Sequence, residues 1–297
     1  MTQQVSQSPA TEEGEWWRSA VIYQIYPRSF NDSNGDGLGD LPGVVDRLDY
    51  LADLGVDALW LSPFYVSPQH DAGYDVSDYR DVDPRFGTLE DFDRMRARMA
   101  ELGMRLIVDL VPNHTSSEHE WFRAAVAAGP GSPERERYLF REGRGEQGEL
   151  PPNNWRSVFG GEAWTRLPDG QWYLHLFDST QPDLNWENPE VKEKMFQIME
   201  YWLDRGLDGF RCDAVPYLFE REGTNCENLP ETHAFLKKLR AHVDAKWKNR
   251  MLLAEANQWP EDTLQYFGDG DECHMGFHFP VMPRLFMALR MEDRFPV

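Results

Sequence analysis

The stretch 206–214 holds the residues best suited to chemistry. It reads Gly-Leu-Asp-Gly-Phe-Arg-Cys-Asp-Ala, a short apolar run that ends in Arg211 and Asp213. Charged side chains at the end of a buried strand are costly unless they find partners. Asp213 is therefore a candidate nucleophile or base, with Arg211 holding its carboxylate ionised. A buried ion pair that only fixes the strand is the alternative, and this stretch alone does not decide between the two.

A second carboxylate, Glu255, directly follows the apolar segment 251–254. Two carboxylates facing across a cleft are what cleavage of a glycosidic bond requires, one as nucleophile and one as proton donor. The apolar surroundings of Glu255 favour its protonated form and hence the acid role, whereas Asp213 suits the nucleophile. The alternative is two unrelated surface carboxylates, which their matching positions at strand ends disfavour.

Two further polar residues follow predicted strands. His114 comes after the apolar segment 105–111 and could form a hydrogen bond with a ligand hydroxyl, although a lone histidine is more often structural. Asp75 lies in the loop after segment 58–61 and, taken alone, is an ordinary polar loop residue that we expect to be solvated.

The acidic loop 32–40 places oxygen-bearing side chains at alternate positions, with glycines between them. Such oxygen ligands suit a hard cation, above all Ca²⁺. The predicted site for a structural Ca²⁺ ion comprises Asp32, Asn34, Asp36, Leu38 and Asp40. The loop begins like an EF-hand, but its twelfth position is Gly43 instead of glutamate, so it would be a calcium loop of another type. An acidic turn without metal is the alternative.

Composition limits the partners of the chain. Its 297 residues are 41% hydrophobic, enough for a large core, and the net charge of −21 makes nucleic acid and anionic membranes poor partners. A neutral or cationic small molecule fits better. The three cysteines lack metal-ligand spacing, which favours a reducing compartment. No signal peptide and no apolar run of about 18 residues is present. We therefore expect a cytoplasmic protein; the oligomeric state stays open.

Strands and helices alternate along the chain. We predict strands at 20–26, 58–61, 105–111, 207–212, 251–255 and 273–279, and helices at 44–54, 88–103, 188–206 and 230–243. This order predicts a parallel sheet, and functional residues at the strand ends favour a (β/α)₈ barrel. A doubly wound sheet would need a glycine-rich turn after the first strand, where this chain is acidic. With six strands instead of eight, the barrel would be incomplete.

The same patterns suggest four parts. Residues 1–15 form a disordered lead, 16–114 the first three barrel strands, 115–177 an inserted subdomain, and 178–297 strands four to six. The third part is too long for a simple connection and lacks sustained periodicity, apart from short strands such as 172–176.

Four separated motifs resemble the α-amylase superfamily of retaining glycosidases, glycoside hydrolase family 13, over roughly residues 16–297. They lie at 109–114, 181–185, 209–214 and 252–255. The resemblance implies a (β/α)₈ barrel with a subdomain after the third strand. It also implies Asp213 as nucleophile, Glu255 as acid and base, and a sugar site formed by Tyr74, Asp75, His114 and Arg211. The loop 32–40 resembles the calcium site of the oligo-1,6-glucosidase branch.

Two parts of the chain resemble different members of that branch. Residues 16–180 look like α-glucosidases, whereas residues 209–297 look like trehalose synthases. Because the second part lies nearest the chemistry, we predict isomerisation of maltose to trehalose, with α-glucoside hydrolysis as the alternative. A retained sugar must stay enclosed, so the loop 217–229 is a candidate lid. A non-catalytic barrel used as a binding module, and a calcium-binding structural protein, are alternatives of other classes.

One family motif is missing. The third catalytic carboxylate of the family lies in an Asn-His-Asp segment, and no such segment occurs in this chain. The sequence therefore resembles the front part of a longer enzyme. We expect residues 1–297 alone to be poorly stable and close to inactive.

Overall fold

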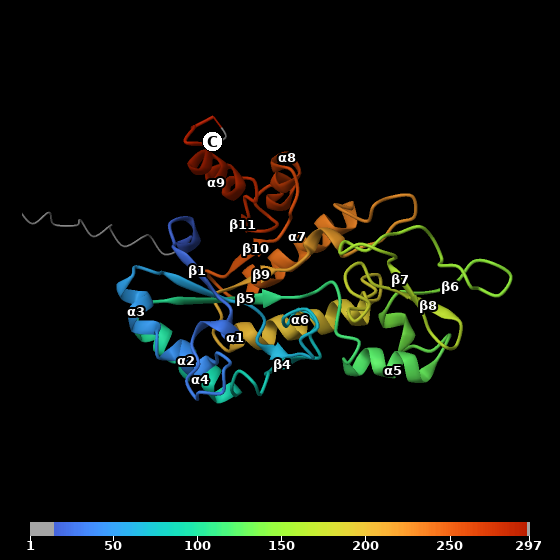
Figure 1. The fold of residues 1–297 in the computed structure, drawn as a ribbon, viewed down its shortest axis with the longest axis horizontal. Helices are drawn as coiled ribbons and strands as arrows, with labels where there is room; N and C mark the ends of the chain where they lie inside the picture. Colours follow the sequence, from blue (N-terminus) through green and yellow to red (C-terminus); the bar gives the residue numbers. More distant parts are fainter. Residues whose placement is uncertain (1–14, 296–297) are drawn as a thin grey trace, which may run out of the picture.

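A six-stranded parallel sheet organises the molecule (Figure 1). We describe it from a computed structural model that covers residues 15–295, so that nearly all of the predicted lead 1–15 lies outside the described residues. The strand order is β1-β2-β5-β9-β10-β11, and every pairing is parallel. The strands are β1 (Ile22–Ile25), β2 (Ala58–Leu61), β5 (Arg105–Leu110), β9 (Gly209–Cys212), β10 (Met251–Ala254) and β11 (Met275–Gly276). This is the predicted incomplete barrel with six strands.

Helices follow the strands and cover one face of the sheet. They include α1 (Pro27–Phe30), α2 (Leu41–Val45), α3 (Leu48–Asp53), α4 (Leu89–Glu101), α6 (Pro189–Asp204) and α7 (Pro230–Lys246). Thr88 and Asp91 form the expected capping box at the start of α4. The single helix predicted at 44–54 is wrong, because the structure has two short helices that are separated at residues 46–47.

The alternation of side chains along each strand separates two layers. Leu59, Leu106, Val108, Phe210 and Leu252 join the large core between sheet and helices. The intervening positions form the inner face, where a smaller cluster comprises Trp16, Trp17, Ala58, Ile107, Met251 and Leu253. Because the side-chain period of a strand is two, Asp109 and Arg211 fall on the inner face, away from the helices.

The segment 115–177 has its own small sheet, to the right in Figure 1. It is antiparallel, in the order β6-β8-β7, with β6 (Phe140–Glu142), β7 (Trp164–Arg166), β8 (Gln171–Leu174) and the helix α5 (Glu120–Ala128) beside it. Trp155, Trp164, Leu174 and Leu176 form a separate apolar cluster there. The sequence did not predict α5, a helix of nine residues that the His119 side chain caps. A hairpin of β3 (Tyr65–Val66) and β4 (Asp78–Val82) was also not predicted.

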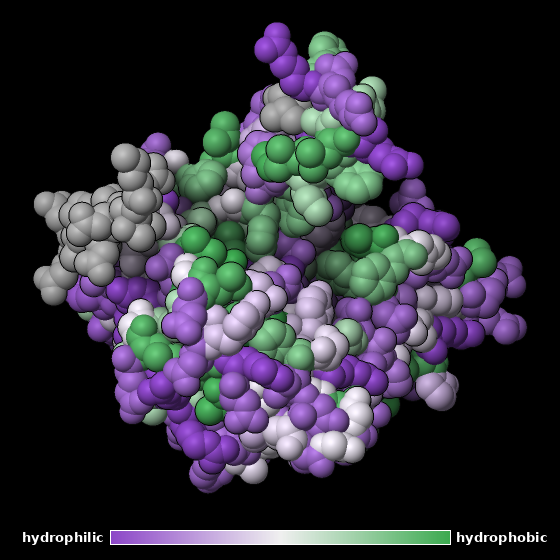
Figure 2. Space-filling model, turned by 60° about the vertical axis from the view of Figure 1, so that its left-hand side comes forward, coloured by the Kyte–Doolittle hydropathy of each residue, from purple (hydrophilic) through white to green (hydrophobic). Residues whose placement is uncertain are grey.

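The last part of the chain is less buried. Strand β11 has two residues, fewer than the predicted 273–279, and is followed by α9 (Val281–Met291), which has no buried side chain. Apolar residues therefore gather on α9, at the top of Figure 2. The remaining short elements are α8 (Pro260–Thr263) and the 3₁₀ turns Trp16–Arg18, Arg135–Arg137, Val215–Tyr217 and Leu264–Phe267. None of the described helices combines the length and apolar character that crossing a membrane requires.

Candidate active site

The carboxyl ends of β5, β9 and β10 converge on one guanidinium. In the sheet register Arg211 lies beside Asp109 on one side and Leu253 on the other, two residues before Glu255. Its Nη1 donates to Asp109 Oδ1 at 2.8 Å and also to Asp213, while Nη2 lies 2.5 Å from Glu255 Oε1. The structure therefore brings together the two predicted catalytic carboxylates, which are far apart in the sequence, on the two arms of one cation.

The two carboxylates have different surroundings. The pKa of Glu255 is raised to about 7, and burial is the main cause. The negative charge of Asp213 also raises this pKa, by more than the positive charge of Arg211 lowers it. Burial also raises the pKa of Asp213, against the opposing effect of Arg211. Arg211 thus contacts Asp213 and lowers its pKa, as expected, but burial raises that pKa by more. Within the pair, Glu255 is the better proton donor, because a hydrogen bond with Asp213 favours its protonated form.

The backbone at the end of β9 also contacts Glu255. Ala214 has a φ of 48°, which is unusual for a residue with a side chain, and its N–H donates to Glu255 Oε2 at 3.1 Å. Such a conformation persists only where its surroundings fix it. The turn after Asp213 therefore orients the acid as well as the nucleophile candidate.

Asp109 is a third carboxylate in this cluster that was not predicted as a site residue. It is fully buried, accepts a hydrogen bond from Trp60 Nε1 at 2.8 Å, and burial raises its pKa to about 7. The signal in the sequence is a single charge in an otherwise apolar strand. The Trp60 and Tyr74 rings lie 5.3 Å and 5.5 Å from the Arg211 guanidinium, which places Tyr74 in the cluster as well.

Asp75 and His114 lie at the edge of this cluster. Asp75 is completely buried, so the expectation of a solvated loop residue is wrong: it accepts hydrogen bonds from Ser67 Oγ and from the backbone N–H groups of residues 70 and 71. His114 is buried too, and burial lowers its pKa to about 4, so it is neutral at pH 7. Its Nε2 lies 3.1 Å from Gln181 Nε2, which also donates to Asp71 at 2.9 Å. Asp71 in turn raises the pKa of Asp213.

The predicted calcium loop is arranged differently. Its side-chain oxygens accept hydrogen bonds from the loop's own backbone: Asp32 from residues 34, 35 and 37, Asn34 from residue 36, and Asp36 from residue 38. Asp40 accepts from Ser33 and Gly43. Nowhere in residues 15–295 do three or more acidic, histidine or cysteine side chains gather as a metal site would need. The donor chemistry suits Ca²⁺, but the carboxylates as placed do not form a cage, and calcium remains a prediction.

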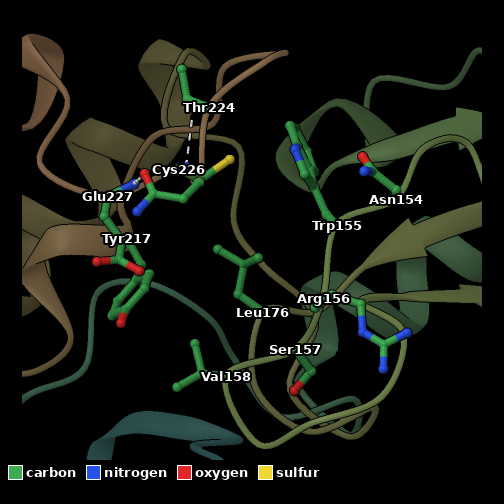
Figure 3. A pocket seen from close by; sticks show the side chains of 11 residues that line it. Asn154, Trp155, Arg156, Ser157, Val158, Leu176, Tyr217, Thr224, Cys226 and Glu227 are labelled. Atoms are coloured by element: carbon green, nitrogen blue, oxygen red, sulfur yellow. Dashed lines mark hydrogen bonds between the residues drawn. The ribbon is translucent and has the colours of Figure 1, made fainter.

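A cavity of about 450 Å³ lies between the inserted segment and the loop 217–229 (Figure 3). Residues 154–158 and Leu176 line one side, and Tyr217 and residues 224–227 line the other. The Tyr217 ring lies 5.6 Å from Phe177, whose ring is 5.1 Å from His114. Burial raises the pKa of Tyr217 to about 12, with added effects of Glu227 and Glu255. Tyr217 lines the cavity and is near enough to Glu255 for that carboxylate to affect its pKa. The size of the cavity suits a small ligand.

Comparison with known proteins defines the class. The α-amylase catalytic domain matches residues 24–292. Trehalulose synthase MutB has a solved structure that superposes with a TM-score of 0.85 at 40% identity, over 91% of this chain and 51% of MutB. The chain belongs to the α-amylase catalytic-domain family, as its motifs predicted.

Two curated relatives place the chain within that family. The trehalose synthase/amylase TreS of Mycolicibacterium smegmatis is 52% identical over 95% of this chain and 48% of its own length. The oligo-1,6-glucosidase of Parageobacillus thermoglucosidasius is 43% identical over 91% of this chain and 50% of its own length. The chain thus spans about half the length of these relatives.

Proposed function

We propose that this chain carries the nucleophile and the acid of an enzyme that isomerises maltose to trehalose. The observation that carries the proposal is the contact of Asp213 and Glu255 with the same Arg211 guanidinium. A retaining glycosidase has its two carboxyl groups about 5 Å apart. Contact of both carboxylates with one guanidinium keeps them close together and so supports this pairing. The substrate is a small α-glucoside.

The first step follows from the two carboxylates. Asp213 attacks the anomeric carbon of the non-reducing glucose, and the bond from that carbon to the bridging oxygen breaks. Glu255, whose pKa of about 7 leaves it largely protonated at pH 6, gives its proton to the departing oxygen. The products of this step are a glucosyl ester of Asp213 and a free glucose.

The second step decides the product. Glu255, now ionised, takes a proton from the incoming hydroxyl as that oxygen bonds to the anomeric carbon and the ester breaks. If the hydroxyl is the anomeric one of the retained glucose, the product is trehalose; if it belongs to water, the product is glucose. The higher identity to a trehalose synthase, 52% against 43% for an oligo-1,6-glucosidase, favours the first outcome.

The test needs a completed enzyme, in which residues 1–297 are continued by the second half of the Mycolicibacterium smegmatis relative. We expect maltose to be converted mainly into trehalose, with glucose as a minor product, when the products are separated by chromatography. Glucose as the sole product would instead support the α-glucosidase alternative. No turnover, in a completed enzyme that melts cooperatively, would support the non-catalytic alternative.

The chain alone has a different expected outcome. Because it contains no Asn-His-Asp segment, the third carboxylate of the family is missing. We expect residues 1–297 by themselves to release glucose or trehalose from maltose at a rate far below that of the completed enzyme. Equal rates for the two proteins would contradict this expectation.

A further inference from the structure

The loop 217–229, which we predicted to be a lid, is bound to its neighbours on both sides. On the side of the inserted segment, Glu222 pairs with Arg141 and accepts a hydrogen bond from Asn153 Nδ2 at 3.0 Å. Further along, Cys226 is buried in the apolar cluster of Trp155, Trp164 and Leu176. The loop thus forms one wall of the cavity in Figure 3 and is packed against the opposite wall.

On the other side, one side chain connects the loop to the segment that carries the acid. Gln258 follows Glu255 by three residues. Its Oε1 accepts a hydrogen bond from Asn228 Nδ2 at 3.1 Å, and its Nε2 donates to Glu227 Oε2 at 3.1 Å. The amide oxygen and the amide nitrogen of Gln258 therefore each form a hydrogen bond, with two consecutive loop residues. Tyr266, which is buried, adds a hydrogen bond from its hydroxyl to Asn228 Oδ1.

The backbone of the loop needs this support. Cys226 and Asn228 have φ values of 62° and 54°, in the left-handed region that side chains disfavour. Conformations of this kind persist only where surrounding contacts fix them. The contacts that fix Asn228 are its N–H bond to the Pro216 carbonyl, at 3.2 Å, and the side-chain bonds to Gln258 and Tyr266.

We propose that Gln258 is a positioning residue that holds loop 217–229 against the carboxyl end of β10, so that the cavity lined by this loop retains the cleaved sugar. Retention of the cleaved sugar rests on the proposed function. Gln258 acts through the loop, because its partner Glu227 lines the cavity together with Tyr217. Retention would decide between trehalose and glucose as the product.

The first test uses residues 1–297 as they are and needs no activity. Cys226, Cys212 and Cys273 are all buried free thiols, so the rate at which each reacts with a thiol reagent reports local opening. In Gln258→Met, which keeps the length of the side chain but removes both hydrogen bonds, we expect Cys226 to react about tenfold faster. Cys212 and Cys273 should keep their rates.

Gln265→Met is the matched control. Gln265 is exposed, and within the described residues 15–295 its amide donates only to Asp262, three residues away. We expect all three thiol rates to stay unchanged in this variant. An unchanged Cys226 rate in Gln258→Met would overturn the proposal. Equal acceleration of all three thiols would also overturn it, because Gln258 would then support the whole fold instead of the loop.

An exchange of the two partners tests the hydrogen bonds directly. Glu227→Gln keeps an acceptor oxygen for Gln258, so its Cys226 rate should stay near that of the unmodified chain. Gln258→Glu places two carboxylates face to face and should accelerate the reaction. In the double variant, the amide introduced at position 227 can donate to one oxygen of the carboxylate introduced at position 258. The other oxygen of that carboxylate still accepts from Asn228. Both hydrogen bonds are then present, and Cys226 should again react slowly. Failure of the double variant to restore it would count against the bonding scheme.

The last test measures products in the completed enzyme. Gln258→Met should lower the ratio of trehalose to glucose several-fold while maltose consumption changes by less than about twofold, since Gln258 touches no reacting atom. An unchanged ratio would overturn the role in retention. If the unmodified completed enzyme makes no trehalose, the proposed function fails, and the thiol experiment still decides whether Gln258 positions the loop.

Discussion

Two acidic regions of this protein bring their carboxylates together in different ways. Around Arg211, three carboxylates from three strands share one buried cation. In the loop 32–40, each acidic side chain accepts hydrogen bonds from backbone N–H groups of the loop or of the residues just after it. The first arrangement depends on strand register across the sheet, and the second depends only on local turns.

The difference shows that burial strengthens the interactions between charged side chains. The cluster around Arg211 is shielded from water, so each charge acts strongly on the others, and burial raises the pKa values of Asp109, Asp213 and Glu255. In the loop, backbone N–H groups lower the pKa of the exposed Asp32. Burial thus raises carboxyl pKa values in the first region, whereas backbone hydrogen bonds lower the pKa of Asp32 in the second.

The largest expected effect comes from the same chemical change made in both regions. Asp213→Asn in the completed enzyme should lower kcat for maltose by about 10⁴-fold or more, because it removes the nucleophile. Asp36→Asn should change kcat by less than about twofold, as is usual for an exposed position. Steady-state kinetics measure both, with thermal melting as the check on folding. Similar losses in the two variants would contradict the distinction between the regions.

The second effect concerns stability. Arg211→Met leaves the buried Asp109 and Asp213 and the half-buried Glu255 without their shared cation, and it should lower the free energy of unfolding of residues 1–297 by about 3–5 kcal/mol. Arg98 is the control, because it also pairs with two carboxylates, Asp49 and Glu101, but all three side chains are exposed. Arg98→Met should cost less than about 1 kcal/mol. Urea unfolding compares them, and equal costs would refute the special role of the cluster.

The sequence predicted the parts of this site that local patterns define. An apolar run that ends in a charge identified Asp213 and Glu255, and the register of the sheet then brought them together. Asp71 and the burial of Asp75 were missed because they depend on contacts with distant segments, such as the hydrogen bond from Gln181 to Asp71. The break between α2 and α3 was missed because the apolar spacing continues across it.

The pH dependence of stability should have opposite signs in the two regions. Glu255 has a pKa of about 7 against an ordinary 4.5, so the folded protein binds the extra proton between these values. Its contribution to stability is therefore present below about pH 4.5 and is lost as the pH rises to 7. Asp32 has a lowered pKa, so its contribution is present above its ordinary 3.8 and is lost as the pH falls below it.

Melting from pH 3 to pH 8 tests these signs in residues 1–297. From about pH 4.5 to 7 the unmodified chain should lose melting temperature relative to Glu255→Gln, which has no titrating group at this position. It should lose melting temperature relative to Asp32→Asn only below about pH 4. In the completed enzyme, kcat/KM for maltose should fall above about pH 7, where Glu255 loses its proton. A rate that is flat from pH 6 to 9 would exclude Glu255 as the acid.

The smallest expected effect is that of calcium, and it tests whether the loop 32–40 is only a set of local turns. Ca²⁺ at millimolar concentration should raise the melting temperature of residues 1–297 by a few degrees over that in EDTA, because an ion that binds only the folded state stabilises it. Asp36→Asn, which removes one predicted ligand, should abolish most of this shift, whereas Asp213→Asn should keep it. If melting is the same with Ca²⁺ and with EDTA, the loop is an acidic turn held by its own backbone, and the contrast with the Arg211 cluster is complete. If the shift is present, the carboxylates of the loop share a cation, as the carboxylates around Arg211 do. In the loop that cation would be Ca²⁺ from the solvent, whereas around Arg211 it is a side chain.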